Sequence, residues 1–167
     1  MEKALLVIDM QNVCVGKTHA SYFKYNNREL IQNVNKVIDA NKENMIIYIK
    51  NEMKRNLLNK LAPFHAYKGT LEVELVEELH VISDYVLVKY KGDAFSNPEL
   101  NRLLKDNNIK QVEVVGVDGG GCVALTAFGA INHGYQVTLN KNAIGTMFHK
   151  KREKYDKKLR KMGAKFL

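Results

Sequence analysis

Three side chains that could act together in catalysis stand next to predicted strands or helices. Asp9 follows the apolar residues 4–8, Lys89 follows the apolar residues 85–88, and Cys122 follows a glycine-rich stretch. A carboxylate can remove a proton, a thiol can attack an electrophilic carbon, and an ammonium group can stabilise anionic charge. If the fold brings the three together, the chemistry is nucleophilic catalysis through a cysteine.

The segment before Cys122 reads Gly116-Val117-Asp118-Gly119-Gly120-Gly121. Such a turn lets the backbone adopt positive φ angles and approach a ligand closely. We expect a helix to begin at Cys122, where the helix macrodipole and unpaired N–H groups would lower the pKa of the thiol. A nearby ammonium such as Lys89 would lower this pKa further. The alternative is that Cys122 is a small buried hydrophobic residue, and local context leaves both interpretations open.

The other local patterns also have structural alternatives. The glycine spacing does not fit a dinucleotide-binding fingerprint, and no Gly-Lys-Ser/Thr follows it as in a P-loop. Asp9 could simply cap the next turn, and Lys89 could be a solvated strand end. The function therefore depends on whether the fold unites these residues.

Apolar runs of strand length alternate with segments of helical period. We expect strands at 3–8, 45–49, 85–88, 112–117 and 136–139, with a short sixth at 164–167. We expect helices at 29–40, 71–79, 122–132 and 147–162, and one that begins at the Asn97-Pro98 start signal. Residues 51–69 should form a long loop with room for a short helix. This alternation predicts one α/β domain over residues 1–167, a three-layer α/β/α arrangement in which helices cover both faces of a parallel sheet of five to six strands. Functional groups then gather beyond the carboxyl ends of the strands.

The net charge of +8 on 167 residues first suggests a nucleic-acid partner. However, nine basic and two acidic residues lie between Lys150 and Lys165, which accounts for +7 of the total. Tyr155, Leu159 and Met162 have helical spacing there, so we interpret the segment as a solvated helix with a buried stripe. We expect no nucleic-acid partner.

Targeting and redox signals are sparse. The apolar residues 4–8 are too few for a signal peptide, and no stretch approaches the roughly 20 apolar residues of a membrane span. Cys14 and Cys122 lie outside any Cys-x-x-Cys pattern, which argues against a disulfide framework or a thiol-bound zinc ion. We expect a cytoplasmic protein without membrane contacts.

The three segments together resemble the isochorismatase-like cysteine hydrolases, a Rossmann-like family that includes nicotinamidases. The resemblance rests on Leu6-Val7-Ile8-Asp9-Met10-Gln11-Asn12, Val88-Lys89 with Ala94-Phe95, and Gly116-Val117 followed by Cys122-Val123, Thr126-Ala127 and Gly134-Tyr135. Lys68-Gly69-Thr70 and Gly163-Ala164 also fit. The three motifs occur in the family's order and span the chain.

The resemblance implies a hydrolase of a small amide or related substrate that works through an acyl-enzyme intermediate. It makes Cys122 the nucleophile, Asp9 the general base and Lys89 their electrostatic partner. It also implies an oxyanion hole formed by the backbone N–H groups of Asp118 and Cys122, with a cis peptide bond between Val117 and Asp118, and Phe95 as a substrate-binding residue.

We expect no cofactor and no metal ion. Nicotinamidases carry Asp-x-His after the second strand, whereas this chain has Asn51-Glu52-Met53, and its five histidines lack ligand spacing. The resemblance implies a small-molecule substrate and a homo-oligomer. The alternatives are a non-catalytic binding or assembly module on the same fold, or a nicotinamidase. No single residue identifies the substrate.

Overall fold

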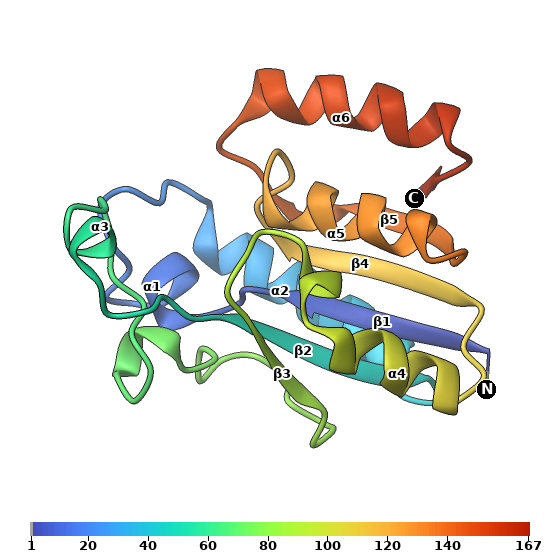
Figure 1. Cartoon of the computed structure of the whole chain (residues 1–167), viewed down its shortest axis with the longest axis horizontal. Helices are drawn as coiled ribbons and strands as arrows, with labels where there is room; N and C mark the ends of the chain where they lie inside the picture. Colours follow the sequence, from blue (N-terminus) through green and yellow to red (C-terminus); the bar gives the residue numbers. More distant parts are fainter. Residues whose placement is uncertain (1) are drawn as a thin grey trace.

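The computed structural model describes residues 2–167 and is built around a six-stranded parallel sheet with the order β3-β2-β1-β4-β5-β6 (Figure 1). The strands are β1 (Lys3–Ile8), β2 (Met45–Asn51), β3 (Val86–Lys89), β4 (Gln111–Val117), β5 (Gln136–Gly145) and β6 (Lys165–Phe166). The α/β fold with a parallel sheet predicted from the sequence is therefore confirmed.

Helices cover both faces of this sheet. They are α1 (Asn12–Val15), α2 (Asn27–Ala40), α3 (Leu57–Lys60), α4 (Pro98–Asp106), α5 (Cys122–Asn132) and α6 (His149–Lys161), with 3₁₀ turns η1 (Leu71–Val73) and η2 (Ala94–Ser96). Helices α4 and α5 lie on the near face in Figure 1, with α6 beside α5, and α2 lies behind the sheet. Two separate hydrophobic clusters result, one on each face.

Strand β1 shows why the sheet is buried on both sides. Leu6 and Ile8 belong to the cluster beneath α4 and α5, while Leu5 and Val7 belong to the cluster beneath α2. Successive side chains of a strand point to opposite faces, so a strand between two helical layers must be apolar throughout. The uninterrupted hydrophobic run at the N-terminus satisfies this requirement.

Local signals set several helix boundaries. The Asn97 side chain accepts a hydrogen bond from the Glu99 N–H at 2.9 Å, and Pro98 occupies the first turn of α4. Gly134 follows α5 with a φ of 88°, which only glycine adopts without cost. The predicted start of α4 and the predicted end of α5 are thereby confirmed.

The helix predicted at 71–79 is wrong. Only η1 forms, and residues 74–76 then run beside residues 10–12 before a turn at 77–78; the Val76 N–H bonds to the Met10 carbonyl at 3.0 Å. Val73, Val76 and Leu79 are buried as their helix-like spacing suggested, but in a loop. Tertiary hydrogen bonds have replaced helical ones here.

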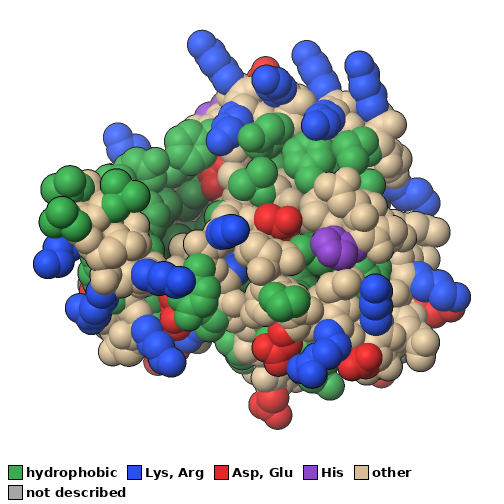
Figure 2. Space-filling view, in the orientation of Figure 1, with side chains coloured by type: hydrophobic (Ala, Val, Ile, Leu, Met, Phe, Trp, Pro, Cys, Tyr) green, Lys and Arg blue, Asp and Glu red, His purple; other side chains and the backbone are tan. Residues whose placement is uncertain are grey.

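Other differences concern lengths. Helix α2 begins two residues before the predicted start, and β5 continues to Gly145 rather than ending at Leu139, with a register irregularity opposite residues 114–116 of β4. The basic side chains of α6 gather along the upper edge of the molecule in Figure 2. Within residues 2–167, no helix has both the length and the apolar character needed to cross a membrane.

Candidate active site

Four neighbouring strands each bring one polar side chain to the same edge of the sheet. Asp9 directly follows β1, Asn51 ends β2, Lys89 ends β3, and Cys122 begins α5 after β4. These strands are adjacent in the order β3-β2-β1-β4, and all are parallel, so their carboxyl ends meet. The structure thus unites the three residues singled out from the sequence and adds Asn51.

The Lys89 ammonium group lies at the centre of this arrangement. Its Nζ donates to Asp9 Oδ2 at 2.9 Å, to Cys122 Sγ at 3.3 Å and to Asn51 Oδ1 at 3.3 Å. The lysine is only 1% exposed and Asp9 only 4%. Lys89 is therefore not a solvated strand end but a buried cation between a carboxylate and a thiol.

Asp9 is held in a specialised backbone conformation. Its φ is 53°, in the left-handed region, and its N–H donates to the Ile49 carbonyl at 2.9 Å. Lys89 occupies Oδ2, whereas the buried Oδ1 has no hydrogen-bond partner among residues 2–167. One carboxylate oxygen is therefore free to accept a proton.

The electrostatics differ from the sequence expectation for Cys122. Burial and the negative charge of Asp9 raise the pKa of its thiol to about 12, although Lys89 acts in the opposite direction. Burial lowers the pKa of Lys89, but the attraction of Asp9 and Cys122 outweighs burial and the net pKa is raised. Burial and the charge of Asp9 thus work against a preformed Cys122 thiolate.

The loop between β4 and α5 presents free backbone donors. The peptide bond between Val117 and Asp118 is cis, as the resemblance implied. The N–H groups of Gly121 and Val123 bond to the Asp118 carbonyl at 2.9 and 3.1 Å. In the described part of the chain, the N–H groups of Asp118 and Cys122 donate to no protein acceptor. Both are available to a ligand.

The Asp118 side chain has a structural task that the sequence did not reveal. Its carboxylate accepts hydrogen bonds from the Gly120 N–H at 2.6 Å, the Met147 N–H at 2.5 Å and the Tyr25 hydroxyl at 3.2 Å. Burial and the Asp118 charge raise the pKa of Tyr25, so this hydroxyl remains a donor. Asp118 thus ties the loop to two distant segments, and only the tertiary structure shows these partners.

A comparison with protein families completes this picture, since residues 3–167 match the Isochorismatase domain family. The chain belongs to the isochorismatase family of hydrolases.

Several relatives of this isochorismatase-family protein are known. A probable inactive nicotinamidase from Arabidopsis thaliana is 28% identical over 142 residues, covering 77% of this chain and 72% of the relative. The pyrazinamidase of Pyrococcus horikoshii in complex with zinc superposes with a TM-score of 0.88 at 24% identity, covering 100% and 99% of the two chains. N-carbamoylsarcosine amidase from Thermoplasma acidophilum gives 0.84 at 24% identity, covering 99% and 95%. These two structures share the fold of this family member.

The donor set of this isochorismatase-family chain does not fit a metal ion of the kind in the zinc-bound relative. Across residues 2–167, no three His, Cys, Asp or Glu side chains are grouped so that they could hold one. The Asn51 oxygen instead accepts a hydrogen bond from Lys89 Nζ, and the Met53 N–H bonds to the Ala66 carbonyl at 2.7 Å. We derive no catalytic step through a metal.

Phe95 lies in the hydrophobic core beside α5. Its ring stacks on His133 at 4.8 Å between centroids and lies near Tyr135, at the opposite end of α5 from Cys122. The reason is that the Ala94 N–H bonds to Thr126 Oγ1 at 3.0 Å, which docks η2 along the side of α5. Phe95 is a buried core residue, and the structure does not place it with Asp9, Lys89 and Cys122.

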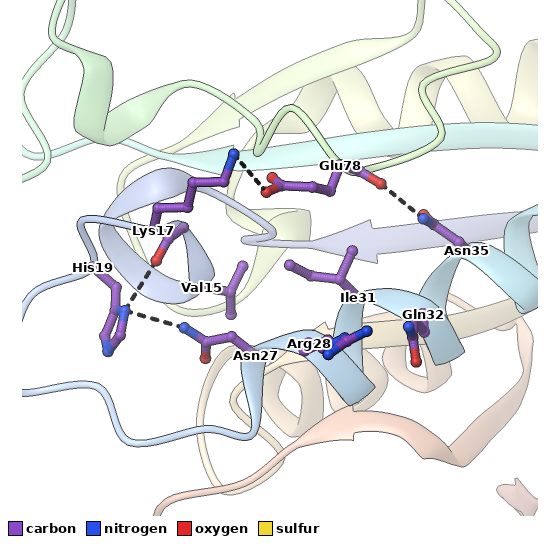
Figure 3. A pocket seen from close by; sticks show the side chains of 10 residues that line it. Val15, Lys17, His19, Asn27, Arg28, Ile31, Gln32, Asn35 and Glu78 are labelled. Atoms are coloured by element: carbon purple, nitrogen blue, oxygen red, sulfur yellow. Dashed lines mark hydrogen bonds and ion pairs between the residues drawn. The ribbon is translucent and has the colours of Figure 1, made fainter.

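Among the cavities near the carboxyl edge of residues 2–167, two have walls that are at least half apolar. One of about 620 Å³ is lined by Tyr22, Pro63, Met147 and Phe148, beside the segment that bonds to Asp118. Figure 2 shows a hollow with hydrophobic walls between the α3 region and α6. The other, of about 500 Å³, lies between α1 and α2 and is rimmed by the Lys17–Glu78 ion pair (Figure 3). Neither cavity is lined by Asp9, Lys89 or Cys122.

Proposed function

We propose that this protein is a cysteine-dependent hydrolase that cleaves the C–N bond of a small amide or related substrate through an acyl-enzyme on Cys122. The observation that carries the proposal is the buried Lys89 ammonium, which donates to both Asp9 Oδ2 at 2.9 Å and Cys122 Sγ at 3.3 Å. A buried carboxylate, cation and thiol in mutual contact are costly to maintain for packing alone.

Asp9 acts as the general base because the thiol is neutral at rest. As the sulfur attacks the carbonyl carbon, the thiol proton moves to the free Oδ1 of Asp9, and Lys89 stabilises the negative charge that develops on the sulfur. The raised pKa of Cys122 favours this coupled transfer over a separate ionisation. Each group then has one defined role.

The tetrahedral oxyanion is received by the backbone N–H groups of Asp118 and Cys122, donors of a kind typically worth about 3 kcal/mol of transition-state stabilisation each. Asp9 returns its proton to the leaving nitrogen as the C–N bond breaks, which leaves a thioester. Asp9 then takes a proton from water, the hydroxide attacks the thioester carbon, and the C–S bond breaks. The sulfur regains its proton from Asp9, and the products are an amine or ammonia and a carboxylic acid.

Ammonia release and trapping of the acyl group test the proposal. Purified protein is incubated with nicotinamide, pyrazinamide, N-carbamoyl amino acids and simple amides, and acyl adducts on Cys122 are sought by peptide mass spectrometry. We expect turnover of one class, its loss in Cys122→Ser and Asp9→Asn, and its retention in Cys14→Ala, the control at the other cysteine. Iodoacetamide should modify Cys122 before the buried Cys14.

The competing candidate is a non-catalytic module, which the probable inactive relative from Arabidopsis thaliana makes concrete. Absence of ammonia release and of any acyl adduct, together with no preferential alkylation of Cys122, would establish that alternative. Turnover restricted to nicotinamide would instead support a nicotinamidase.

A further inference from the structure

Asn51 completes the set of acceptors around Lys89. A lysine ammonium carries three protons. The structure provides three acceptors for them, namely Asp9 Oδ2 at 2.9 Å, Asn51 Oδ1 at 3.3 Å and Cys122 Sγ at 3.3 Å. With two protons held by oxygen atoms, the third is directed at the sulfur. The rotation of the ammonium group is thereby fixed.

Asn51 itself is held by a fully buried side chain. Gln11 Oε1 accepts from the Asn51 N–H at 2.8 Å, and Gln11 Nε2 donates to the Asn51 carbonyl at 3.1 Å and to the Val73 carbonyl at 2.8 Å. One carboxamide therefore clamps both backbone groups of Asn51. Asn51 also pairs with Lys89 in the β2–β3 register. The oxygen that faces Lys89 cannot easily move away.

The neutrality of this oxygen matters as much as its position. A carboxylate at residue 51 would accept the same proton but would add a second negative charge beside Asp9. That charge would draw the ammonium toward itself and oppose the negative charge that develops on Cys122 during attack. A carboxamide supplies the acceptor without this penalty.

We propose that Asn51 is a positioning residue for Lys89, whose neutral oxygen holds one ammonium proton so that another points at the Cys122 sulfur without a second anion in the site. This assignment rests on the proposed function. Asn51 acts through Lys89 and need not touch the substrate.

The decisive variant is Asn51→Asp, because it keeps the shape and the acceptor oxygen and changes only the charge. Its readout is the rate of Cys122 alkylation by iodoacetamide between pH 6.5 and 9.5, followed by peptide mass spectrometry, which requires no substrate. We expect a rate roughly tenfold lower at each pH, equivalent to a thiol pKa raised by about one unit. If Asn51 were only a structural acceptor, Asn51→Asp would leave the alkylation rate of Cys122 unchanged.

The matched control is Asn132→Asp, which adds the same charge at the far end of α5, about 15 Å along the helix from Cys122. It should alkylate within about twofold of the unmodified protein, since the charge is exposed and screened. Asn51→Leu, which removes the acceptor, should slow alkylation by roughly fivefold because a buried ammonium proton loses its partner. Equal rates for Asn51→Asp and Asn132→Asp would overturn the proposal.

Lys89→Met, measured alongside, separates the two levels of the argument. If it slows alkylation and Asn51→Asp does not, only the assignment of Asn51 is wrong. If Lys89→Met has no effect either, the proposed triad fails and the role of Asn51 fails with it. Should the Asn51 variants not fold, the ¹⁵N signal of the Lys89 ammonium in the unmodified protein decides. If the ammonium group donates to three acceptors, its protons should exchange slowly with water and its ¹⁵N signal should be visible. A missing signal would contradict the three-acceptor arrangement.

Discussion

Replacing Lys89 by methionine should destabilise the protein strongly. The substitution keeps an unbranched side chain, one heavy atom shorter, and removes its charge. The side chain of Lys89 is 0% exposed and that of Asp9 6% exposed, and they form an ion pair at 2.9 Å. Without Lys89, the Asp9 carboxylate is left buried and uncompensated. Loss of one partner from such a pair costs about 3–5 kcal/mol in free energy of unfolding.

Thermal and urea unfolding measure this cost. A chain of this length loses about 2–4 °C in Tm for each kcal/mol, so Lys89→Met should melt about 6–20 °C below the unmodified protein. Lys91→Met is the matched control, since Lys91 is exposed two residues further along. The double variant Asp9→Asn/Lys89→Met should be more stable than Lys89→Met alone, because the unpaired carboxylate is gone.

Two results would refute this reasoning. The first is a Lys89→Met Tm within about 2 °C of the Lys91→Met control, less than the effect of 1 kcal/mol. The second is a double variant less stable than Lys89→Met alone. Either result would mean that the Asp9 carboxylate does not depend on Lys89 for its charge compensation.

Three further predictions concern stability. Gly116→Ala should lower the free energy of unfolding by several kcal/mol, because the new Cβ would meet backbone atoms of the neighbouring strand. Gly134→Ala is also at positive φ but in open space, so it should lower the free energy of unfolding by only about 1 kcal/mol. Urea unfolding distinguishes the two variants. Burial raises the pKa of the Cys14 and Cys122 thiols, so the folded state retains protons that the unfolded chain releases above about pH 8.5. The free energy of unfolding should therefore fall by up to about 1.4 kcal/mol per pH unit for each thiol above that pH, and a constant value from pH 8 to 10 would contradict this. Asn97→Ala should lower stability by about 1 kcal/mol through the lost cap of α4, and an unchanged Tm would show the cap to be dispensable.

The sequence predicted those parts of the fold that local patterns determine. Strand β1 and helix α5 were found at their observed bounds, because an apolar run flanked by polar residues and a glycine-ended helix are both readable from neighbours in the chain. The helix predicted at 71–79 failed because its hydrogen bonds go to residues 10–12, about 60 positions earlier. Hydrogen-bond partners so far apart in the chain leave no pattern in the local sequence.

The same distinction applies to the site. Asp9, Lys89 and Cys122 could be named because they follow predicted strands or begin a predicted helix, and a parallel sheet gathers such positions at one edge. In the sequence, Asn51 stands out only as a departure from a metal-ligand motif, because its bond to Lys89 depends on the register of β2 and β3. The raised pKa of Cys122 also could not be predicted from the sequence, because the burial of the thiol depends on which residues pack over it.

The origin of the site in four consecutive strand ends has a consequence for folding. Lys89 and Asp9 are 80 residues apart in the sequence, and Lys89 and Cys122 are 33 apart. No contiguous fragment shorter than the span from β1 to α5 holds all the groups, and a fragment that ends before β3 leaves the Asp9 carboxylate without its Lys89 partner. Asp9 and Lys89 both belong to the β3-β2-β1 half of the sheet, so their ion pair reports the assembly of that half. The contact between Lys89 and Cys122 reports the docking of β4 and α5 against it, and contacts of such long range are characteristic of slow, cooperative assembly.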